Sequence, residues 1–343
     1  MQEALATLVS GGTLDATRAE AVFESILTGE AEPAQVGALL ALIQRRGAAV
    51  EEIVGGARVM RRHVERVPYE PTADIRLIDT CGTGGAPKTF NISTASAIVA
   101  AAAGFSRGVR VAKHGNRSRT GRGSAEVLQA LGVKVDASPA TQARCLEEAG
   151  VCFCFAIHHH PAMRHAAGPR KALAFPTIFN LLGPLTNPAG ATRQLIGVYD
   201  ASLVEPMAEA LRIRGAEHAM VVHGLDGLDE ITTTNRTRRA IVRDGAIDLG
   251  HIDPDTLGLA RTALDDLRAV SLDDGARLVR DALAGEAGPV TDIVALNAAA
   301  ALVVAGVAGV ENDFPNALAR AREAIASGAA TRTLDRLIEV SNA

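Results

Sequence analysis

Two loops that suit phosphate binding follow one another between residues 79 and 125. The first, Gly82-Thr83-Gly84-Gly85, follows the mostly apolar run Ile75 to Ile78 and precedes an alanine-rich stretch that predicts a helix. Glycines let backbone N–H groups approach an anion where a Cβ would clash, and a helix N-terminus favours negative charge. We therefore expect an anion to bind at this turn.

The second loop is polar and basic, and it separates a predicted strand at Gly108 to Ala112 from a predicted helix at Ser124 to Leu131. Its polar residues are Lys113, His114, Asn116, Arg117, Ser118, Arg119, Thr120 and Arg122. A glycine-rich turn alone also occurs for geometric reasons, and the first loop has neither Walker A nor Rossmann spacing. Arg119 and Arg122 fit surface positions as well as a ligand. Two such loops on successive strands still favour a phosphorylated ligand.

Length and charge limit the classes of protein that this chain can be. With 343 residues, 48% of them apolar, it can form one large α/β domain and a smaller one. A formal net charge of -4 argues against general nucleic-acid binding. The first residues lack the pattern of a secretory signal, and the longest apolar run, Ala295 to Val310, is shorter than the ~20 residues of a membrane-spanning helix. We expect a cytoplasmic protein with a small phosphorylated ligand, and no membrane or nucleic-acid partner.

The first part of the chain reads as helices without an intervening strand. Helical spacing of apolar residues, with Glu32-Pro33 as a helix start, predicts a small helical domain over residues 1–67. Its helices are expected at Met1 to Ser10, Thr13 to Thr28, Ala34 to Arg46 and Val50 to Val67. A linker at Pro68 to Pro71 ends this domain.

Strands alternate with helices in residues 72–343, which predicts a large α/β domain with a mostly parallel central sheet flanked by helices. Strands are expected at Arg76 to Asp79, Val109 to Ala112, Val151 to Ile157, Gln194 to Val198 and His218 to His223, with a hairpin around Arg239 to Ile247. Helices are expected at Ser93 to Ala103, Ser124 to Leu131, Pro139 to Ala149 and Leu203 to Arg214, then at Leu272 to Ala284, Asp292 to Val310 and Phe314 to Ala326.

Several motifs together resemble the signature loops of the anthranilate phosphoribosyltransferase family, enzymes of tryptophan biosynthesis in the nucleoside phosphorylase-like class of phosphoribosyltransferases. They are Asp79 to Gly85, Asn91 to Ala95, Lys113 to Ser118 and Gly123 to Ala125, then His160 to Arg164 with Arg170, Thr177 to Pro188, and Asp229-Glu230. They occur in the family's order over nearly the whole chain. The resemblance implies transfer of the phosphoribosyl group of phosphoribosyl pyrophosphate to the amino group of anthranilate, with release of pyrophosphate. It also implies that a segment near residues 160–187 returns to the helical domain and walls an interdomain cleft, and that the protein is a homodimer.

The resemblance assigns residues to each substrate. For phosphoribosyl pyrophosphate these are Gly82, Gly84, Gly85, Ala86, Lys88, Thr89, Asn91, Ser93, Thr94, Lys113, Asn116, Arg117, Ser118, Gly121 and Ser124. For anthranilate they are Gly82, His114, Asn116, His160, Arg170 and Gly183. A guanidinium can meet a planar carboxylate with two hydrogen bonds, which makes Arg170 the acid-recognising residue.

The resemblance also implies a magnesium site and a mode of catalysis. Ser93, Asp229 and Glu230 would bind Mg²⁺, as two ions whose shells the substrate phosphates complete. The displacement needs positioning and charge neutralisation, so no general acid or base is expected. By residue type alone, Asp229-Glu230 fits a solvated surface pair, and Ser93 and Thr94 are also typical N-cap residues.

The chain departs from the family pattern around the phosphate loops. Ala86 stands where the family usually has Asp after the GTGG turn, and each of the two loops is one residue short. Pro176 stands where an Arg is common. Our hypothesis is that Lys88 and the extra arginines compensate by binding pyrophosphate more through charge.

Two other functions stay open at this level. A pyrimidine nucleoside phosphorylase also binds phosphate beside a ribosyl centre, but those chains are longer and lack the segment Thr177 to Pro188. A non-catalytic nucleic-acid-binding relative of the same fold would show a broad positive face and lack the residues expected to bind anthranilate.

Overall fold

The computed structural model describes residues 1–343 except 87–88, 119–120, 308 and 310–312. Four helices begin the chain: α1 (Gln2–Val9), α2 (Ala16–Leu27), α3 (Pro33–Arg46) and α4 (Val50–Arg62). They bury Phe23, Leu40 and Ile53 in a shared core. The prediction extended α4 to Val67, which is wrong. The backbone N–H groups of Glu65 and Val67 instead donate to the carbonyls of His159 and Pro188, so this stretch is tied to a later segment.

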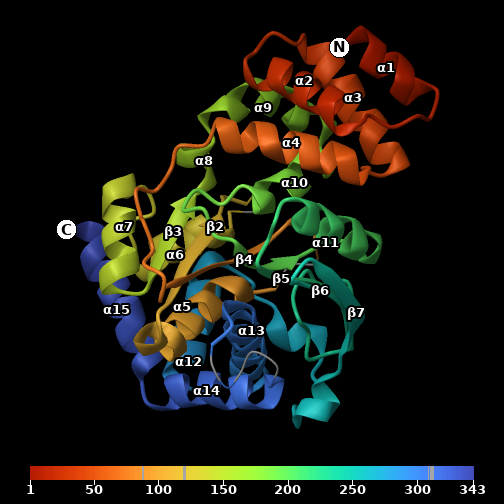
Figure 1. Cartoon of the computed structure of the whole chain (residues 1–343). Helices are drawn as coiled ribbons and strands as arrows, with labels where there is room; N and C mark the ends of the chain where they lie inside the picture. The colour runs from red at the N-terminus through yellow and green to blue at the C-terminus, as the bar shows by residue number, and fades with distance from the viewer. Residues whose placement is uncertain (87–88, 119–120, 308, 310–312) are drawn as a thin grey trace.

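A segment far along the chain lies beside these four helices (Figure 1). It contains α8 (Ala156–His159), α9 (Arg164–Leu173) and α10 (Ile178–Leu182). The rings of Phe23 and Phe179 meet edge to face with centroids 5.6 Å apart. Gly56 of α4 leaves room for Leu182, because a Cβ at this position would lie 2.7 Å from the Leu182 side chain. The helical part is therefore built from two stretches of sequence.

The second part is a seven-stranded sheet in the order β3-β2-β1-β4-β5-β6-β7. The parallel strands are β1 (Arg76–Gly82), β2 (Val109–Gly115), β3 (Val151–Phe155), β4 (Arg193–Gly197) and β5 (His218–Gly224). The antiparallel strands β6 (Thr237–Arg243) and β7 (Ala246–Ile252) extend one edge. The predicted fold class, a small helical domain before an α/β domain with a mostly parallel sheet, is confirmed.

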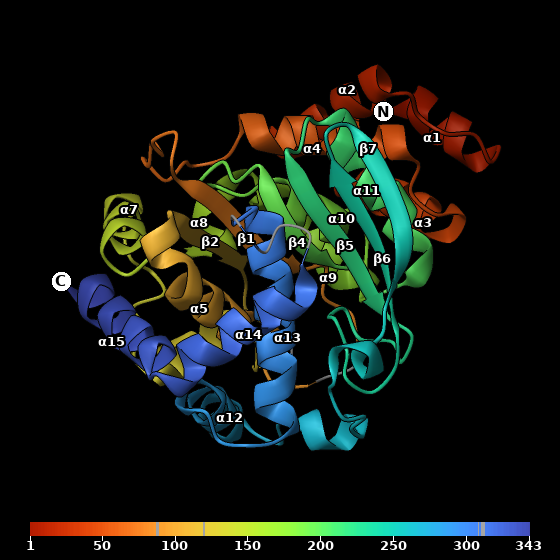
Figure 2. The same ribbon diagram turned by 60° about the horizontal axis from the view of Figure 1, so that its bottom comes forward.

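Helices cover both faces of the sheet, as two views of the chain show (Figures 1 and 2). They are α5 (Ile92–Gly104), α6 (Ser124–Leu131), α7 (Pro139–Glu148), α11 (Val204–Ile213), α12 (Leu272–Ala284), α13 (Pro289–Ala305), α14 (Phe314–Ala326) and α15 (Ala329–Asn342). Sequence analysis had not predicted α15, and it extended α13 to Val310. The helix ends earlier because Gly306 adopts the left-handed conformation at its C-cap, with φ of 67°.

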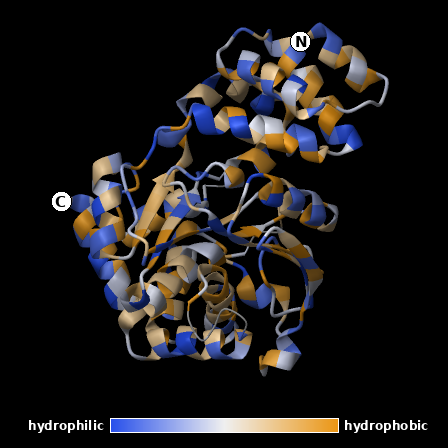
Figure 3. Ribbon diagram, viewed as in Figure 1, coloured by the Kyte–Doolittle hydropathy of each residue, from blue (hydrophilic) through white to orange (hydrophobic). Residues whose placement is uncertain are grey.

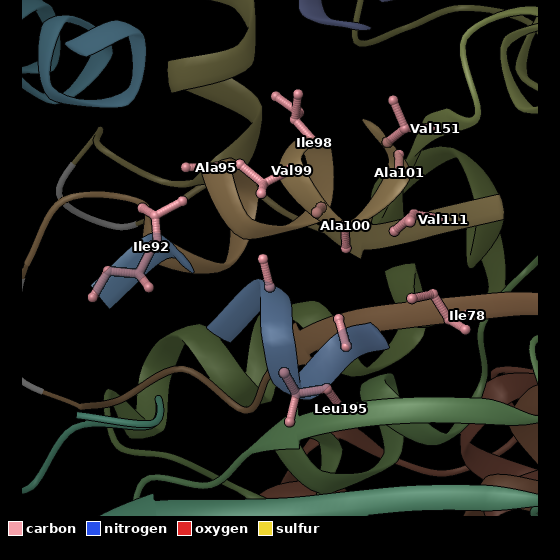
Figure 4. Close-up of a cluster of buried hydrophobic side chains, with 14 of the residues drawn as sticks. Ile78, Ile92, Ala95, Ile98, Val99, Ala100, Ala101, Val111, Val151 and Leu195 are labelled. Carbon is pink, nitrogen blue, oxygen red and sulfur yellow. The ribbon is translucent and has the colours of Figure 1, made fainter. Parts of the chain in front are cut away.

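The main core lies between α5, α13 and the parallel strands. Figure 4 shows side chains of α5, among them Ala100 and Ala101, on the side of the helix that faces Val111 of β2 and Val151 of β3. Both helices and the central strands are largely hydrophobic (Figure 3). In the part of the chain that the structure describes, no single helix is long and apolar enough to cross a membrane. The helices α12 and α13 have the required length and composition only when taken together, and they are bent by 70° relative to each other.

Candidate active site

The carboxyl ends of the five parallel strands lie at one edge of the sheet, and most of the predicted site residues follow them. The chain passes from β1 to β2 and β3 on one side of the sheet, then to β4 and β5 on the other. In open α/β sheets, ligands bind outside the carboxyl ends of the strands where the strand order reverses. Here that point lies between β1 and β4, and the Gly82-Thr83-Gly84-Gly85 turn leaves β1 at this position.

The turn after β1 is held by three hydrogen bonds of Thr83. Its N–H donates to the Gly197 carbonyl at 2.9 Å, and its hydroxyl accepts from the N–H of Tyr199 at 3.0 Å. The side-chain amide of Asn180 on α10 donates to the Thr83 carbonyl at 3.0 Å. Gly84 and Gly85 have φ of 64° and 102°, which a residue with a Cβ rarely adopts. The turn is therefore fixed by β4 on one side and α10 on the other.

The N-terminus of α5 differs from the prediction in how it is capped. Asn91 is the N-cap residue, with no side-chain capping bond, and its amide donates to the Arg122 carbonyl at 3.5 Å. Ser93 and Thr94 lie inside the first turn, so their expected role as N-caps is wrong. The Thr94 hydroxyl is buried and makes no hydrogen bond within the described residues.

Lys113, at the end of β2, is 3% exposed and reaches across the strand ends. Its ammonium donates to the Thr80 carbonyl at 2.8 Å and to the Ser93 hydroxyl at 3.1 Å. Burial lowers the pKa of Lys113, and the nearby charge of Asp79 opposes this lowering. The fully buried Asp79 also accepts a hydrogen bond from the His114 N–H at 3.0 Å. The Lys113 side chain is thus held at the centre of the candidate site.

Ser93 joins this lysine to the acidic pair in the loop between β5 and β6. Glu230 accepts hydrogen bonds from the backbone and the hydroxyl of Ser93. Burial, followed by the charge of Asp229, raises the pKa of Glu230 to about 8. Asp229 also lies against Gly82, where a Cβ would be 2.8 Å from its carboxylate oxygen. The structure therefore brings together all three predicted metal ligands and one glycine of the phosphate turn.

Mg²⁺ fits this donor set. Two adjacent carboxylates beside a hydroxyl are hard oxygen ligands, and a divalent cation offsets both the burial and the mutual repulsion that raise the pKa of Glu230. Within the described residues, no group of three or more His, Cys, Asp or Glu side chains forms a closed metal site. Mg²⁺ usually takes few protein ligands and keeps waters or substrate phosphates. Ser93, Asp229 and Glu230 would hold it in this way.

The second predicted loop folds back on the N-terminus of α6. The Ser124 hydroxyl donates to the Asn116 carbonyl at 3.3 Å, and the Gly121 N–H donates to the Ser118 carbonyl at 3.0 Å. The N–H of Ser118 donates to the Glu126 carboxylate, which also caps the helix. The Arg117 guanidinium lies 5.6 Å from the centroid of the Phe155 ring.

Three other residues predicted to bind phosphoribosyl pyrophosphate lie in the stretch between β1 and α5. Ala86 follows the glycine turn and is partly buried. The Thr89 hydroxyl donates to the neighbouring Phe90 carbonyl at 3.0 Å. Lys88 lies outside the described residues, as does Arg119 of the second loop.

Two histidines predicted to bind anthranilate meet in the buried part of the site. Nε2 of His114 lies 3.3 Å from Nε2 of His160, and both side chains are buried. Burial lowers the pKa of His114, and a hydrogen bond to the backbone of Gly183 opposes this. Burial lowers the pKa of His160 to about 4. The imidazoles of this pair are therefore neutral at pH 7.

Arg170 lies on α9, with its guanidinium 5.4 Å from the centroid of the Phe179 ring on α10. Burial lowers its pKa from the usual arginine value. Among the described residues, no side-chain contact joins Arg170 to His114 or His160. The anthranilate role of Arg170 stays a prediction.

A cavity of about 690 Å³ lies elsewhere, between β5, β6, β7 and the helices α13 and α14. None of the described residues predicted for substrates or metal lines it. Its charged residues include Arg239, which pairs with Asp248. We assign it no part in the candidate active site.

Sequence analysis missed several residues that position the site. Thr83 and Asn180 belong to recognised motifs, yet their mutual hydrogen bond depends on the return of α10. Asn187 donates to the carbonyl of Ala112 at 2.7 Å and fixes the end of β2. Asn297, a polar residue in an apolar run, hydrogen-bonds the backbone of Ile231, the residue after Asp229-Glu230.

Family models match both parts of the chain. One described as the helical bundle domain of a glycosyl transferase family matches residues 2–64, and one described as the a/b domain of that family matches residues 74–331. The two domains and the phosphate loops at the sheet edge define the class: the chain is a member of this glycosyl transferase family.

Individual relatives narrow the class. An anthranilate phosphoribosyltransferase of Rubrobacter xylanophilus is 49% identical over 99% of this chain and 97% of its own length. A crystal structure of the anthranilate phosphoribosyltransferase of Thermus thermophilus has a TM-score of 0.89 and 39% identity, covering 99% of both chains. An anthranilate phosphoribosyltransferase of Saccharomyces cerevisiae, in complex with PRPP and Mg, has the same fold, with a TM-score of 0.86, 24% identity and coverage of 99% of this chain and 97% of its own. Within its class, the chain belongs to the anthranilate phosphoribosyltransferases, which confirms the predicted family.

Proposed function

We propose that the chain transfers the phosphoribosyl group of phosphoribosyl pyrophosphate to the amino group of anthranilate, giving N-(5′-phosphoribosyl)anthranilate and pyrophosphate. This is the second step of tryptophan biosynthesis from chorismate. The observation that carries the proposal is the cluster of Ser93, Lys113 and Glu230 beside the Gly82 to Gly85 turn. The relatives named for this activity support it over nearly the full length of the chain.

The chemistry follows from what the cluster offers. In the displacement, the C1′–pyrophosphate bond breaks while the amine nitrogen forms its bond to C1′, and negative charge builds on the departing pyrophosphate. Backbone N–H groups of the Gly82 to Gly85 turn and the Lys113 ammonium would stabilise that charge in place. Mg²⁺, bound through Ser93, Asp229 and Glu230, would neutralise pyrophosphate further. The amine loses its proton after attack, so no residue need act as a strong base.

Anthranilate would enter between the two parts of the chain. His114, His160 and the backbone of Gly183 offer a neutral polar face, and Arg170 offers a guanidinium for the carboxylate. The amino group must lie behind C1′, opposite the leaving pyrophosphate. We propose that these residues bind anthranilate in this way and that Asn116 lies between anthranilate and phosphoribosyl pyrophosphate.

Further proposals remain. The homodimer through the helical domain, a second Mg²⁺ ion and the return near 160–187 come from the resemblance. The cytoplasmic location and the division of the chain at residues 67 and 72 come from the sequence pattern. Size-exclusion chromatography with light scattering tests the first of these. A monomer at micromolar concentration would remove it.

The test of the function is the loss of anthranilate fluorescence when purified protein is mixed with anthranilate, phosphoribosyl pyrophosphate and Mg²⁺. We expect the loss to stop when EDTA removes the metal. No loss with Mg²⁺ present would overturn the proposal. Phosphorolysis of uridine would then favour a nucleoside phosphorylase, and binding of single-stranded nucleic acid without turnover would favour a non-catalytic relative.

A further inference from the structure

Asn297 occupies an unusual position in the core. It is fully buried, and it is the only polar residue in the buried run Ile293 to Ala305 of α13, a helix whose residues are all described. Burying an amide in apolar surroundings costs free energy unless its hydrogen bonds are made. If α13 only filled the core, an apolar residue at this position would make the protein more stable. The presence of a buried amide therefore indicates a specific role.

The Asn297 amide hydrogen-bonds both backbone polar groups of Ile231, a residue 66 positions earlier in the chain. Its Oδ1 accepts from the Ile231 N–H at 3.0 Å, and its Nδ2 donates to the Ile231 carbonyl at 2.8 Å. The second Nδ2 hydrogen donates to the Ile293 carbonyl, one helical turn earlier, at 2.9 Å. Two bonds to the backbone of one residue and one to the helix fix both the position and the orientation of Ile231.

Ile231 directly follows Asp229 and Glu230, so the hydrogen bonds of Asn297 also restrict the position of the acidic pair. The ends of β4 and β1 also lie close to Asp229. A Cβ at Gly197 of β4 would lie 1.6 Å from the Asp229 carbonyl oxygen, and a Cβ at Gly82 of β1 would lie 2.8 Å from the Asp229 carboxylate. Residues 229–231 thus lie close to two glycines at strand ends and are hydrogen-bonded by one buried amide.

We infer that Asn297 is a positioning residue for the divalent cation, because it holds Asp229 and Glu230 at a fixed distance from Ser93 on α5. This inference rests on the proposed function, in which those three residues bind Mg²⁺. Residues that orient metal ligands without touching the metal typically change metal affinity by about 10- to 100-fold when they are replaced. Asn297 would orient the metal ligands in this way although it lies in the core and does not touch the metal.

A plainer role competes with this one. The N–H and carbonyl of Ile231 are buried and need partners, and Asn297 supplies both. A role limited to this would lower stability and leave the dependence on Mg²⁺ unchanged. The two roles therefore differ in a measurable way.

The experiment compares Asn297→Leu and Asn297→Asp with Leu302→Ala. Asn297→Leu keeps the branched shape of the side chain and removes every hydrogen bond, whereas Asn297→Asp keeps an acceptor for the Ile231 N–H. Leu302 lies on the same helix and is buried away from the acidic pair, so Leu302→Ala gives a matched loss of core stability. Thermal unfolding measures stability, and calorimetric titration with phosphoribosyl pyrophosphate at a series of Mg²⁺ concentrations measures metal-linked binding without turnover.

We expect Asn297→Leu to raise the Mg²⁺ concentration for half-maximal binding of phosphoribosyl pyrophosphate by about 10- to 100-fold, and Asn297→Asp to raise it less. Leu302→Ala should leave it unchanged at a comparable loss of melting temperature. An unchanged Mg²⁺ dependence in both Asn297 variants overturns the inference alone. If Asn297→Leu does not fold, Asn297→Asp decides by the same measure. Wild-type protein that binds phosphoribosyl pyrophosphate independently of Mg²⁺ overturns the proposed metal role and the inference with it.

Discussion

The side-chain amide of Asn180 donates to the Thr83 carbonyl at 3.0 Å, which joins α10 of the helical part to the glycine turn at the sheet edge. Oδ1 of the same side chain accepts from the Thr177 N–H at 3.1 Å at the start of α10. The two parts of the chain are thus linked by a hydrogen bond at the loop proposed to hold pyrophosphate. Movement of α10 would carry this turn with it.

Replacing Asn180 by Ala should therefore affect the turn as well as stability. Loss of the two hydrogen bonds should lower the free energy of unfolding by about 1–2 kcal/mol. Displacement of the turn should raise the apparent constant for phosphoribosyl pyrophosphate by about tenfold or more. Steady-state kinetics and urea unfolding check both effects. Asn342→Ala, which removes an exposed amide bonded to the Gly132 carbonyl, is the control; equal kinetics in the two variants would contradict the prediction.

Removing one charge from the acidic pair should weaken metal-dependent turnover. Glu230→Gln keeps the size of the side chain and its contact with Ser93, but it leaves Asp229 as the only carboxylate of the pair. We expect the Mg²⁺ concentration for half-maximal rate to rise by at least about tenfold. The rate of anthranilate fluorescence loss as a function of Mg²⁺ provides the measurement. The control is Glu209→Gln, which changes a partly exposed carboxylate paired with Arg212 on α11; a shift of the same size there would refute the role of Glu230.

The buried histidine pair should make stability fall at mildly acidic pH. In the folded protein the pKa of His160 is about 4, whereas an unfolded histidine has a pKa of about 6.5. The unfolded chain then binds the extra proton, so this contribution to stability is intact above pH 6.5 and is lost as pH falls from about 6.5 to 4. At about 1.4 kcal/mol per pKa unit, the lowered pKa of His160 is worth on the order of 3 kcal/mol of stability over this whole pH range.

His160→Asn should flatten the pH dependence of the free energy of unfolding between pH 6.5 and 4.5. Denaturant unfolding at several pH values gives the slope for wild type and variant, and groups common to both cancel in the difference. Besides His114, the groups around the pair include His159, whose charge lowers both pKa values, and Lys113, whose charge lowers that of His114. His251→Asn, at an exposed position on β7, should leave the slope unchanged. Identical slopes for wild type and His160→Asn would show that the pair does not resist protonation.

Lys88 carries the hypothesis about the altered phosphate loop. If its charge compensates for Ala86, then Lys88→Ala should raise the apparent constant for phosphoribosyl pyrophosphate far more than that for anthranilate. Kinetics with each substrate varied in turn separate the two constants. Lys134→Ala, at an exposed lysine before α7, is the matched control. An equal effect on both constants, or none, would remove the hypothesis.

Local sequence was sufficient for the features that depend on local physics. Strand, glycine turn and helix follow one another around Gly82, so the carboxyl edge of a parallel sheet could be predicted as the place of the loops. The helix start at Pro33 was predictable from the fixed φ of proline. Ser93 misled us for the same reason: its type favours an N-cap, but it lies inside the first turn of α5, in contact with Lys113 of β2 and with Glu230 of the loop after β5.

Features that depend on distant partners were not predictable. The end of α4 depends on hydrogen bonds from Glu65 and Val67 to residues about a hundred positions later. The hydrogen bonds between Asn297 and Ile231 join residues 66 positions apart. Because no periodicity connects such pairs, only the folded chain reveals them.

The position of α13 has a consequence for the order of synthesis. Strand β1 pairs with β4 as well as with β2, and α13 covers it together with α5, so part of its contacts comes from residues 193–197 and 289–305. A ribosome that has made both phosphate loops still has more than half of the chain to add before α13 is complete. Until then the nascent β1 has its early partners β2 and α5 but lacks α13. A chain that ended between residues 125 and 193 would carry both loops without β4 and α13, the two late partners of β1.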